Sequence, residues 1–305
     1  MSEPLLEIRG LRKHYGAVRA LDGIDLQVRA GSVYGFIGPN GAGKTTTIRI
    51  LAGLIRPTSG SVFLGGRDLR ADRVRAAQGL RALVEVPSFY PGLSGRENLT
   101  VFAKLARAEA GEVDRLLEAV GLTHAAQRAV GGYSLGMRQR LGIAQALVGK
   151  PRLVVLDEPM NGLDPSAIHL VRELILAERQ TRGVTFFLSS HLLHDVETLC
   201  DEVGIIHRGA IVAEGRIEEL LGDAISGYHV RTADDAKALE ALTASIPAAR
   251  PRLHPDGGLV VEGDEALAPA LHRALLEVGM PAIAVTPMRE TLERYFIEKT
   301  DGVMG

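Results

Sequence analysis

The first part of the chain alternates short apolar strands with helical patterns. Residues 24–28 (IDLQV) alternate apolar and polar side chains, as a half-buried strand does, and the apolar run 33–37 (VYGFI) follows a short turn. After a glycine-rich stretch at 38–43, apolar residues recur at helical spacing over 46–54, and Pro57 ends this pattern. The pattern predicts a strand, a loop and a helix in immediate succession.

A mostly helical segment then interrupts the α/β pattern. The periodicity is helical from about 94 to 150, and an apolar strand returns at 153–157 (LVVLD). The elements that we expect to complete this part are a strand at 184–188, a helix at 191–200, and strands near 203–206 and 210–213. We therefore predict an α/β domain with a mixed sheet over 1–217, carrying a helical subdomain at about 94–150.

Residues 218–305 have a different pattern of apolar positions, which predicts a small α+β domain. The expected order is strand 228–232, helix 234–244, strand 250–254, strand 258–262, helix 265–278 and strand 282–286. This βαββαβ order is the ferredoxin-like arrangement. Pro269 leaves the start of the second helix open, and a final amphipathic helix near 289–299 could pack on either domain.

Composition fits a globular protein with two domains. The chain has 305 residues, of which 46% are hydrophobic and 24% charged, which excludes a disordered or fibrous protein. No run approaches 18 apolar residues, and the N-terminus lacks the apolar stretch of a signal peptide, so we expect neither a membrane span nor export. Cys200 is the one cysteine and cannot form an internal disulfide; this fits a reducing compartment, and we assign it no role.

The charge balance indicates an anionic small ligand rather than nucleic acid. The net charge is −2, but residues 1–220 carry 27 Lys/Arg against 24 Asp/Glu, and residues 221–305 carry 8 against 13. Neither part has the basic stripe that binding to a phosphate backbone requires. We therefore expect no nucleic-acid partner.

A phosphate-binding loop is the most specific motif in the sequence. The segment 38–45 (GPNGAGKT) matches G-x-x-x-x-G-K-[ST] and lies between a predicted strand and a predicted helix, where its mechanism requires it. The glycines let backbone N–H groups face a polyphosphate, Lys44 would reach the β- and γ-phosphates, and Thr45 would give its hydroxyl to Mg²⁺. The residues that we expect to bind nucleotide here are Gly38, Pro39, Asn40, Gly41, Ala42, Gly43, Lys44, Thr45 and Thr46.

A pair of carboxylates follows the predicted strand at 153–157. Asp157 stands at the strand end, where a carboxylate can hold the Mg²⁺ shell, and Glu158 follows where it could polarise a water molecule. The alternative is a purely structural pair of acids.

Taken in order, the motifs resemble the ATP-binding cassette (ABC) ATPases. The resemblance covers about 4–215 and rests on the phosphate loop, the helical insert, YSLGMRQRLGIAQAL at 133–147, the Asp-Glu strand, NGLDP at 161–165 and SSHLLHDVE at 189–197. It implies the fold of a P-loop NTPase cassette and hydrolysis of ATP with Mg²⁺.

The resemblance also assigns individual residues. Tyr15 matches the aromatic that stacks on adenine, and Ser134 and Gly136 match the signature segment, which contacts ATP bound to the other subunit. Asp164 matches the turn that couples the two sites, and His191 matches the switch histidine that senses the γ-phosphate. With Glu158 and Lys44 as the further catalytic residues, two cassettes would pack head to tail around two ATP molecules.

The sequence departs from the usual family pattern at two motifs. Glu85 stands where the family usually has a Gln that touches Mg²⁺, and this looks like the branch of exporters for bacteriocins, lantibiotics and related antibiotics. Glu85 thus joins Thr45 and Asp157 as an expected metal contact, with an ordinary surface acid as the alternative. Leu135 and Met137 replace the usual glycine and Gln of the signature segment.

The resemblance implies the ATP-hydrolysing subunit of an exporter, peripheral on the cytoplasmic face of the membrane. Its partners would be a second cassette and a separate transmembrane permease, whose coupling helix would enter a groove around Phe89, Tyr90, Pro91 and 95–105. The alternative is a soluble, non-transport ABC ATPase that acts on a ribosome or DNA machine. The expected cargo is an antibiotic, a peptide or a lipid-like molecule.

Overall fold

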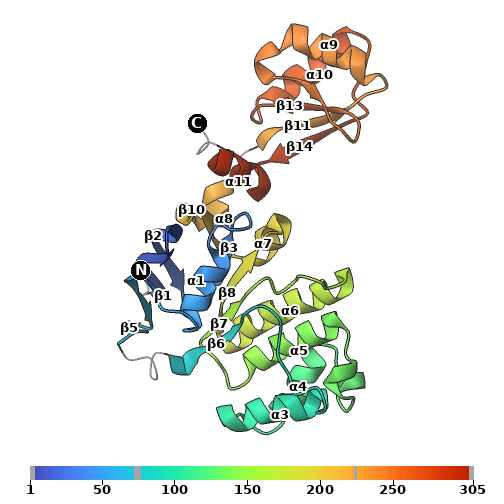
Figure 1. The fold of residues 1–305 in the computed structure, drawn as a ribbon. Helices are drawn as coiled ribbons and strands as arrows, with labels where there is room; N and C mark the ends of the chain where they lie inside the picture. Colours follow the sequence, from blue (N-terminus) through green and yellow to red (C-terminus); the bar gives the residue numbers. More distant parts are fainter. Residues whose placement is uncertain (1–3, 72–76, 223–224, 302–305) are drawn as a thin grey trace. The chain divides into compact units, whose positions relative to one another are not determined.

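The computed structural model describes residues 4–71, 77–222 and 225–301, and these form two compact units. The first unit extends to Ile217 and takes in the chain again from Lys299, while the second comprises Glu218–Glu298 (Figure 1). Each unit has its own hydrophobic core.

The first unit is built on a six-stranded mixed sheet. Its strand order is β10-β9-β3-β8-β7-β6, with parallel pairing throughout except for β10, which is antiparallel to β9. The strands are β3 Val33–Ile37, β6 Leu80–Leu83, β7 Leu153–Leu156, β8 Thr185–Ser190, β9 Glu202–His207 and β10 Ala210–Arg216. The predicted α/β class with a mixed sheet is confirmed, and the carboxyl ends of β3, β8, β7 and β6 share one edge of the sheet.

An antiparallel sheet forms a second layer of this unit. Its order is β2-β1-β4-β5. The strands are β1 Pro4–Tyr15, β2 Val18–Arg29, β4 Ser59–Leu64 and β5 Arg67–Asp68. Of this sheet the sequence pattern predicts only part of β2, because four irregularities in the β1–β2 register interrupt the alternation of apolar side chains along β1.

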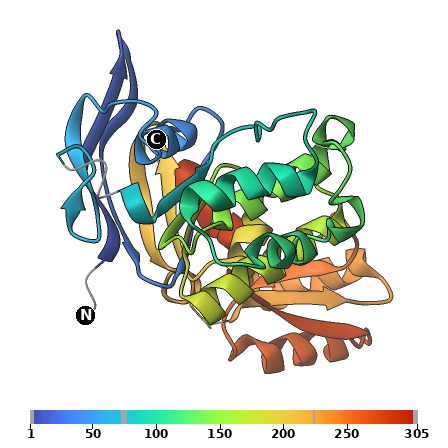
Figure 2. The ribbon, with the colours of Figure 1, turned by 90° about the horizontal axis from the view of Figure 1, so that it is seen from below.

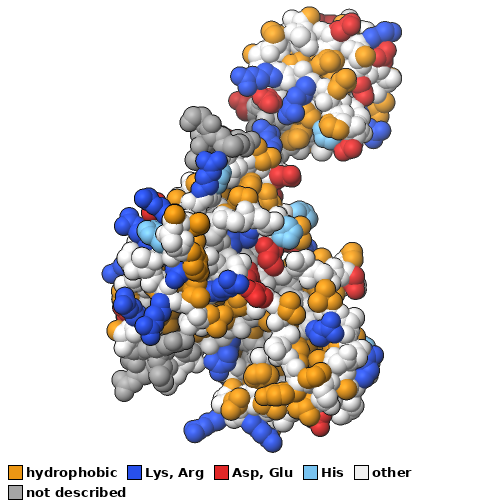
Figure 3. Space-filling model, in the orientation of Figure 1, with side chains coloured by type: hydrophobic (Ala, Val, Ile, Leu, Met, Phe, Trp, Pro, Cys, Tyr) orange, Lys and Arg blue, Asp and Glu red, His pale blue; other side chains and the backbone are white. Residues whose placement is uncertain are grey.

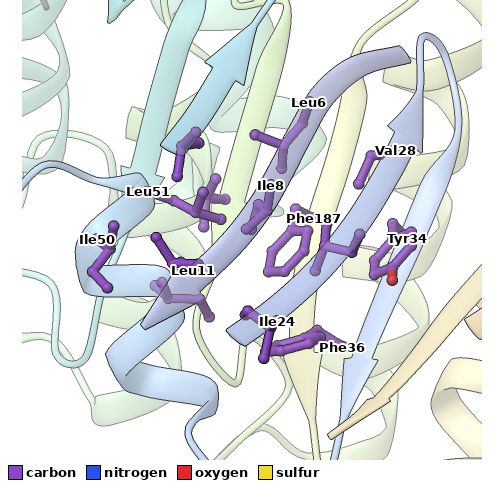
Figure 4. Packing of buried hydrophobic residues seen from close by; sticks show 14 of the residues in the cluster. Leu6, Ile8, Leu11, Ile24, Val28, Tyr34, Phe36, Ile50, Leu51 and Phe187 are labelled. Atoms are coloured by element: carbon purple, nitrogen blue, oxygen red, sulfur yellow. The ribbon is translucent and has the colours of Figure 1, made fainter. Parts of the chain in front are cut away.

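The main core lies between the two sheets, with helix α1, Lys44–Leu51, packed into it. Figure 4 shows Leu6, Ile8 and Leu11 of β1 in this core, between α1 and the six-stranded sheet. The Phe187 ring stacks on the Tyr34 ring with centroids 5.4 Å apart and lies 5.3 Å from the Phe36 ring. Burial of such rings contributes much of the free energy of folding, so the strands that carry the site are rigidly supported.

Helices cover the remaining sides of the first unit. They are α3 Gly95–Ala106, α4 Glu112–Ala119, α5 Leu135–Leu147, α6 Pro165–Arg182 and α7 Leu193–Leu199. The short helix α8, Ile217–Leu221, begins at the last residue of the first unit and continues into the second. Figure 2 shows α3, α4 and α5 grouped as a layer of their own, away from β1 and β2. This grouping is the helical segment predicted at about 94–150. No helix in the described ranges is long and apolar enough to span a membrane.

The second unit has the expected βαββαβ order. It consists of β11 Ile225–Arg231, α9 Asp235–Ser245, β12 Arg252–Leu253, β13 Leu259–Glu262, α10 Leu267–Glu277 and β14 Ala284–Arg289. The sheet order is β12-β13-β11-β14, and all its pairs are antiparallel, as in ferredoxin-like domains. Pro269 lies in the first turn of α10, where its missing N–H costs little. Helix α11, Leu292–Asp301, passes from the second unit into the residues grouped with the first.

Candidate active site

The phosphate loop leads from β3 into α1 with a backbone that glycine makes possible. Gly41 and Gly43 have φ of 81° and 118°, in the region that residues with a Cβ rarely adopt. A Cβ on Gly38 would lie 2.3 Å from the carbonyl oxygen of Ile206, so the loop also packs closely on β9. In the described chain no side chain caps the N-terminus of α1, and this leaves its first N–H groups available to bind an anion.

Lys44 is held in the loop by a backbone contact. Its side chain is only 7% exposed, and Nζ donates a hydrogen bond of 2.6 Å to the Gly38 carbonyl oxygen. The same Nζ lies 3.8 Å from Oε1 of Glu158. A buried ammonium group with an acid on one side and open N–H groups nearby is suited to a polyphosphate.

Glu158 is the acid that meets two other predicted site residues. Its Oε2 lies 2.7 Å from Nδ1 of His191, while its Oε1 faces Lys44. Glu158 has φ of 48°, an uncommon conformation for a residue with a Cβ. Glu158 and His191 are 25% and 49% exposed, so a water molecule can reach both. This geometry suits a general base.

Ser189 is a site residue that the sequence analysis misses. Its hydroxyl donates a 2.7 Å hydrogen bond to Oδ1 of Asp157 and accepts a 2.9 Å hydrogen bond from the Glu158 N–H. Asp157 is itself buried, and its N–H donates to the Leu83 carbonyl oxygen at the end of β6. Ser189 therefore holds the carboxylate of Asp157 and the backbone of Glu158. The sequence signal that could reveal Ser189 is its position two residues before the histidine at the end of the strand.

Glu85 follows β6 at the same edge of the sheet, and its φ of 62° is also in the left-handed region. Its carboxylate forms an ion pair with the Arg49 guanidinium on α1, and 54% of its side chain is exposed. Thr45 and Thr46 follow Lys44 in the first turn of α1 and are half-buried. Thr45, Asp157 and Glu85 together supply hydroxyl and carboxylate oxygens, the donors that Mg²⁺ prefers, so the donor set fits this ion.

Tyr15 lies at the end of β1, in the turn that leads into β2. Its ring is 48% exposed, and the Lys13 ammonium lies 4.8 Å from the ring centroid. Lys13 also donates a hydrogen bond to the Arg56 carbonyl oxygen, which follows α1. One face of the ring is thus occupied by a cation, and the ring remains exposed enough to stack on a base.

The signature segment lies beside the Asp164 turn. Ser134 caps α5 by accepting a hydrogen bond from the Met137 N–H, and Asp164 caps α6 by accepting from Ala167. A Cβ on Gly136 would lie 3.5 Å from the Leu163 side chain, so these turns touch. Among the described residues, no hydrogen bond or ion pair joins Ser134 or Gly136 to the phosphate loop, in contrast to Glu158 and His191. Leu135 is 52% exposed.

Charged side chains gather near the site on the visible face of the first unit. Figure 3 shows Lys/Arg, Asp/Glu and His side chains next to one another over the region of β8 and α7. A cluster of both signs is suited to an anionic ligand that binds together with a metal cation.

Comparison with known proteins decides the family. A family model described as ABC transporter matches residues 21–161. The bacitracin transport ATP-binding protein BcrA of Bacillus licheniformis is 38% identical over 299 residues, which is 98% of each chain. The chain belongs to the ABC transporter ATP-binding proteins.

Other relatives of this ABC ATPase agree. The lantibiotic transport ATP-binding protein SrtF of Streptococcus pyogenes is 40% identical over 210 residues, 69% of this chain and 90% of the relative. A solved ATP binding subunit of an ABC transporter matches with a TM-score of 0.65 at 32% identity, over 71% of this chain and 91% of that chain. The predicted resemblance is confirmed, and so is the main interpretation: the protein is the ATP-binding, ATP-hydrolysing subunit of an ABC transporter, in preference to a soluble ribosome or DNA machine.

Proposed function

We propose that Glu158 activates the water that attacks the γ-phosphate of ATP, with His191 and Lys44 completing the catalytic group. The observation that carries this proposal is the position of the Glu158 carboxylate, with one oxygen 2.7 Å from His191 and the other 3.8 Å from Lys44. His191 orients the carboxylate, and Lys44 offsets negative charge on the phosphoryl oxygens. Tyr15 stacks on the adenine, and residues 38–46 hold the phosphates.

Mg²⁺ is the cation that this proposal requires. The hydroxyl of Thr45 and the carboxylates of Asp157 and Glu85 would hold it, and the ion would neutralise charge on the β- and γ-phosphates. Ser189 keeps Asp157 in place for this contact through the hydrogen bond at 2.7 Å.

The signature residues act, in this proposal, on the nucleotide of a second copy of the chain. Ser134 and Gly136 lie beside the Asp164 turn and have no bond to the phosphate loop of their own chain within the described residues. A head-to-tail dimer would bring the signature segment of one copy to the ATP of the other. ATP binding then closes the dimer and hydrolysis opens it, which supplies motion to the transporter.

A separate transmembrane permease is the second proposed partner, bound on the cytoplasmic face of the membrane. Large apolar side chains are exposed on α3 and in the segment before it: Tyr90 precedes α3 and is 59% exposed, and Leu105 on α3 is 77% exposed. A hollow of about 200 Å³ lies next to Leu105, between α3, α5 and β6, and includes Phe102 and Ala146. Figure 3 shows hydrophobic side chains gathered in the lower part of this face. An amphipathic coupling helix fits such a surface.

The proposed activity is export of an antibiotic, a peptide or a lipid-like molecule. Two observations support this cargo class: Glu85 replaces the usual Gln, and the relatives BcrA and SrtF are named for transport of bacitracin and of a lantibiotic.

Affinity capture of the full chain from detergent-solubilised membranes of its host tests the permease. We expect a multi-span protein in stoichiometric amount, and Leu105→Glu should abolish its capture. Leu276→Glu is the matched control, because Leu276 is 63% exposed but lies on α10 of the second unit. Capture of ribosomal or DNA-bound proteins without a multi-span partner would overturn the exporter proposal.

A further inference from the structure

The ion pair between Glu85 and Arg49 connects two motifs of the site. Arg49 lies in the last turn of α1, the helix whose first residue is Lys44. Glu85 follows β6, whose neighbour β7 leads directly to Asp157. The pair therefore joins the helix of the phosphate loop to the strand edge that carries the expected metal contacts.

Arg49 and Glu85 are both exposed enough to leave each other and bind another partner. Arg49 and Glu85 are 41% and 54% exposed, and ion pairs at such exposure are weak. The Arg49 guanidinium donates the hydrogen bond of this pair, and Oε1 of Glu85 accepts it.

We infer that Arg49 is a positioning residue that holds the Glu85 carboxylate and competes for it with the cation of the bound nucleotide. This inference rests on the proposed role of Glu85 at Mg²⁺. A neutral Gln in the same place would bind a guanidinium only weakly, so the competition is specific to a chain with a carboxylate here. The cation can bind Glu85 only after Arg49 has left this carboxylate. The free energy needed to separate Arg49 from Glu85 therefore weakens binding of the cation.

Binding of Mn²⁺, a paramagnetic substitute for Mg²⁺, tests this competition without any turnover. The full chain is saturated with ADP and titrated with Mn²⁺, and free Mn²⁺ is followed by electron paramagnetic resonance. The variants are Arg49→Gln, Glu85→Gln and the double variant. We expect Arg49→Gln to tighten Mn²⁺ binding about threefold while Glu85 is present, and to change it little in the Glu85→Gln background.

The controls separate this competition from simpler effects. Arg9→Gln removes an arginine from another exposed ion pair, with Glu7 on β1, and should leave Mn²⁺ binding unchanged. Equal tightening by Arg49→Gln in both backgrounds, or none in either, would overturn the inference, because Arg49 would then act as a distant charge or not at all. If Glu85→Gln alone leaves Mn²⁺ binding unchanged, the proposed metal role of Glu85 is wrong as well.

Discussion

The two oxygens of the Glu158 carboxylate face two different partners: Oε2 lies 2.7 Å from His191 Nδ1, and Oε1 lies 3.8 Å from Lys44 Nζ. The histidine follows β8 and the lysine begins the helix after β3, so three neighbouring strands of the sheet converge on one acid. The backbone of Glu158 is held in its left-handed conformation by the bond from its N–H to Ser189. The fold thereby fixes the direction in which this carboxylate presents its lone pairs.

Replacing Glu158 by Gln should remove catalysis and retain nucleotide binding. The amide keeps the size of the side chain but has no basic oxygen, so we expect ATP hydrolysis to fall at least about a hundredfold. ATP-bound dimers should accumulate because they no longer open. Phosphate release measures the first effect, and light scattering after gel filtration with ATP measures the second. Glu173→Gln, an exposed acid on α6, is the control. Wild-type turnover in Glu158→Gln would show that another group is the base.

Ser189→Ala should slow hydrolysis without weakening ATP binding in proportion. The hydroxyl bridges the Asp157 carboxylate and the Glu158 N–H, and its loss frees the side chain of Asp157 and the backbone that carries Glu158 to move. Displacement of a catalytic group by about 1 Å can cost on the order of a hundredfold in rate, so we expect kcat to fall tenfold to about a hundredfold. Steady-state kinetics separate kcat from KM. Ser32→Ala removes a similarly buried hydroxyl before β3, at the other end of the sheet, and should have little effect.

The sequence predicts the residues that carry the chemistry of this site better than the residues and strands that hold them in place. Lys44, Asp157 and Glu158 belong to contiguous motifs that adjoin predicted strands, and such local patterns are visible without a fold. Ser189 is not predicted, because its importance arises from the pairing of β8 with β7, which brings two distant segments together. The antiparallel sheet is largely missed for a related reason: bulges in β1 break the alternation that would reveal a strand. The partner of Glu85 could not be predicted either, since Arg49 lies 36 residues earlier in the chain.

Stability of the first unit should depend on pH through Glu202. This side chain is buried, with Oε1 at 2.7 Å from Arg29 and Oε2 without a partner among the described residues. Burial raises the pKa of Glu202, and the charge of Arg29 opposes this shift only in part. Between the ordinary pKa of 4.5 and the raised pKa of the folded state, the folded chain keeps a proton on Glu202 that the unfolded chain has lost. As pH rises through this window, the contribution of Glu202 to the free energy of unfolding therefore falls.

Glu202→Gln tests this dependence, because an amide does not titrate and still offers an oxygen to Arg29. We expect the variant to gain stability relative to the wild type as pH rises through that window, and to show no such gain below pH 4.5. Urea unfolding followed by circular dichroism at a series of pH values measures the difference. A difference that is constant with pH would mean that Glu202 has the same pKa in both states.

Arg182→Met should be strongly destabilising, because it breaks a buried ion network between α4 and α6. Arg182 lies 2.8 Å from Glu112 and 3.0 Å from Glu178, and the two acids are 6% and 3% exposed. Arg115 also pairs with Glu178 but is 42% exposed. Removal of one partner from a buried network leaves a charge without compensation, so we expect a loss of about 3 kcal/mol.

Two further variants show whether the cost comes from the buried acids. Arg9→Met breaks an exposed pair with Glu7 and should cost less than about 0.5 kcal/mol. Adding Glu178→Gln to Arg182→Met removes one buried charge and should recover part of the lost stability. The recovered part is the interaction free energy between the two residues, which a double-mutant cycle isolates. Additive losses would mean that Arg182 stabilises the fold through its packing rather than through these carboxylates. In the expected case, the network is what holds the helical layer, and with it the signature segment, against α6 and its Asp164 turn.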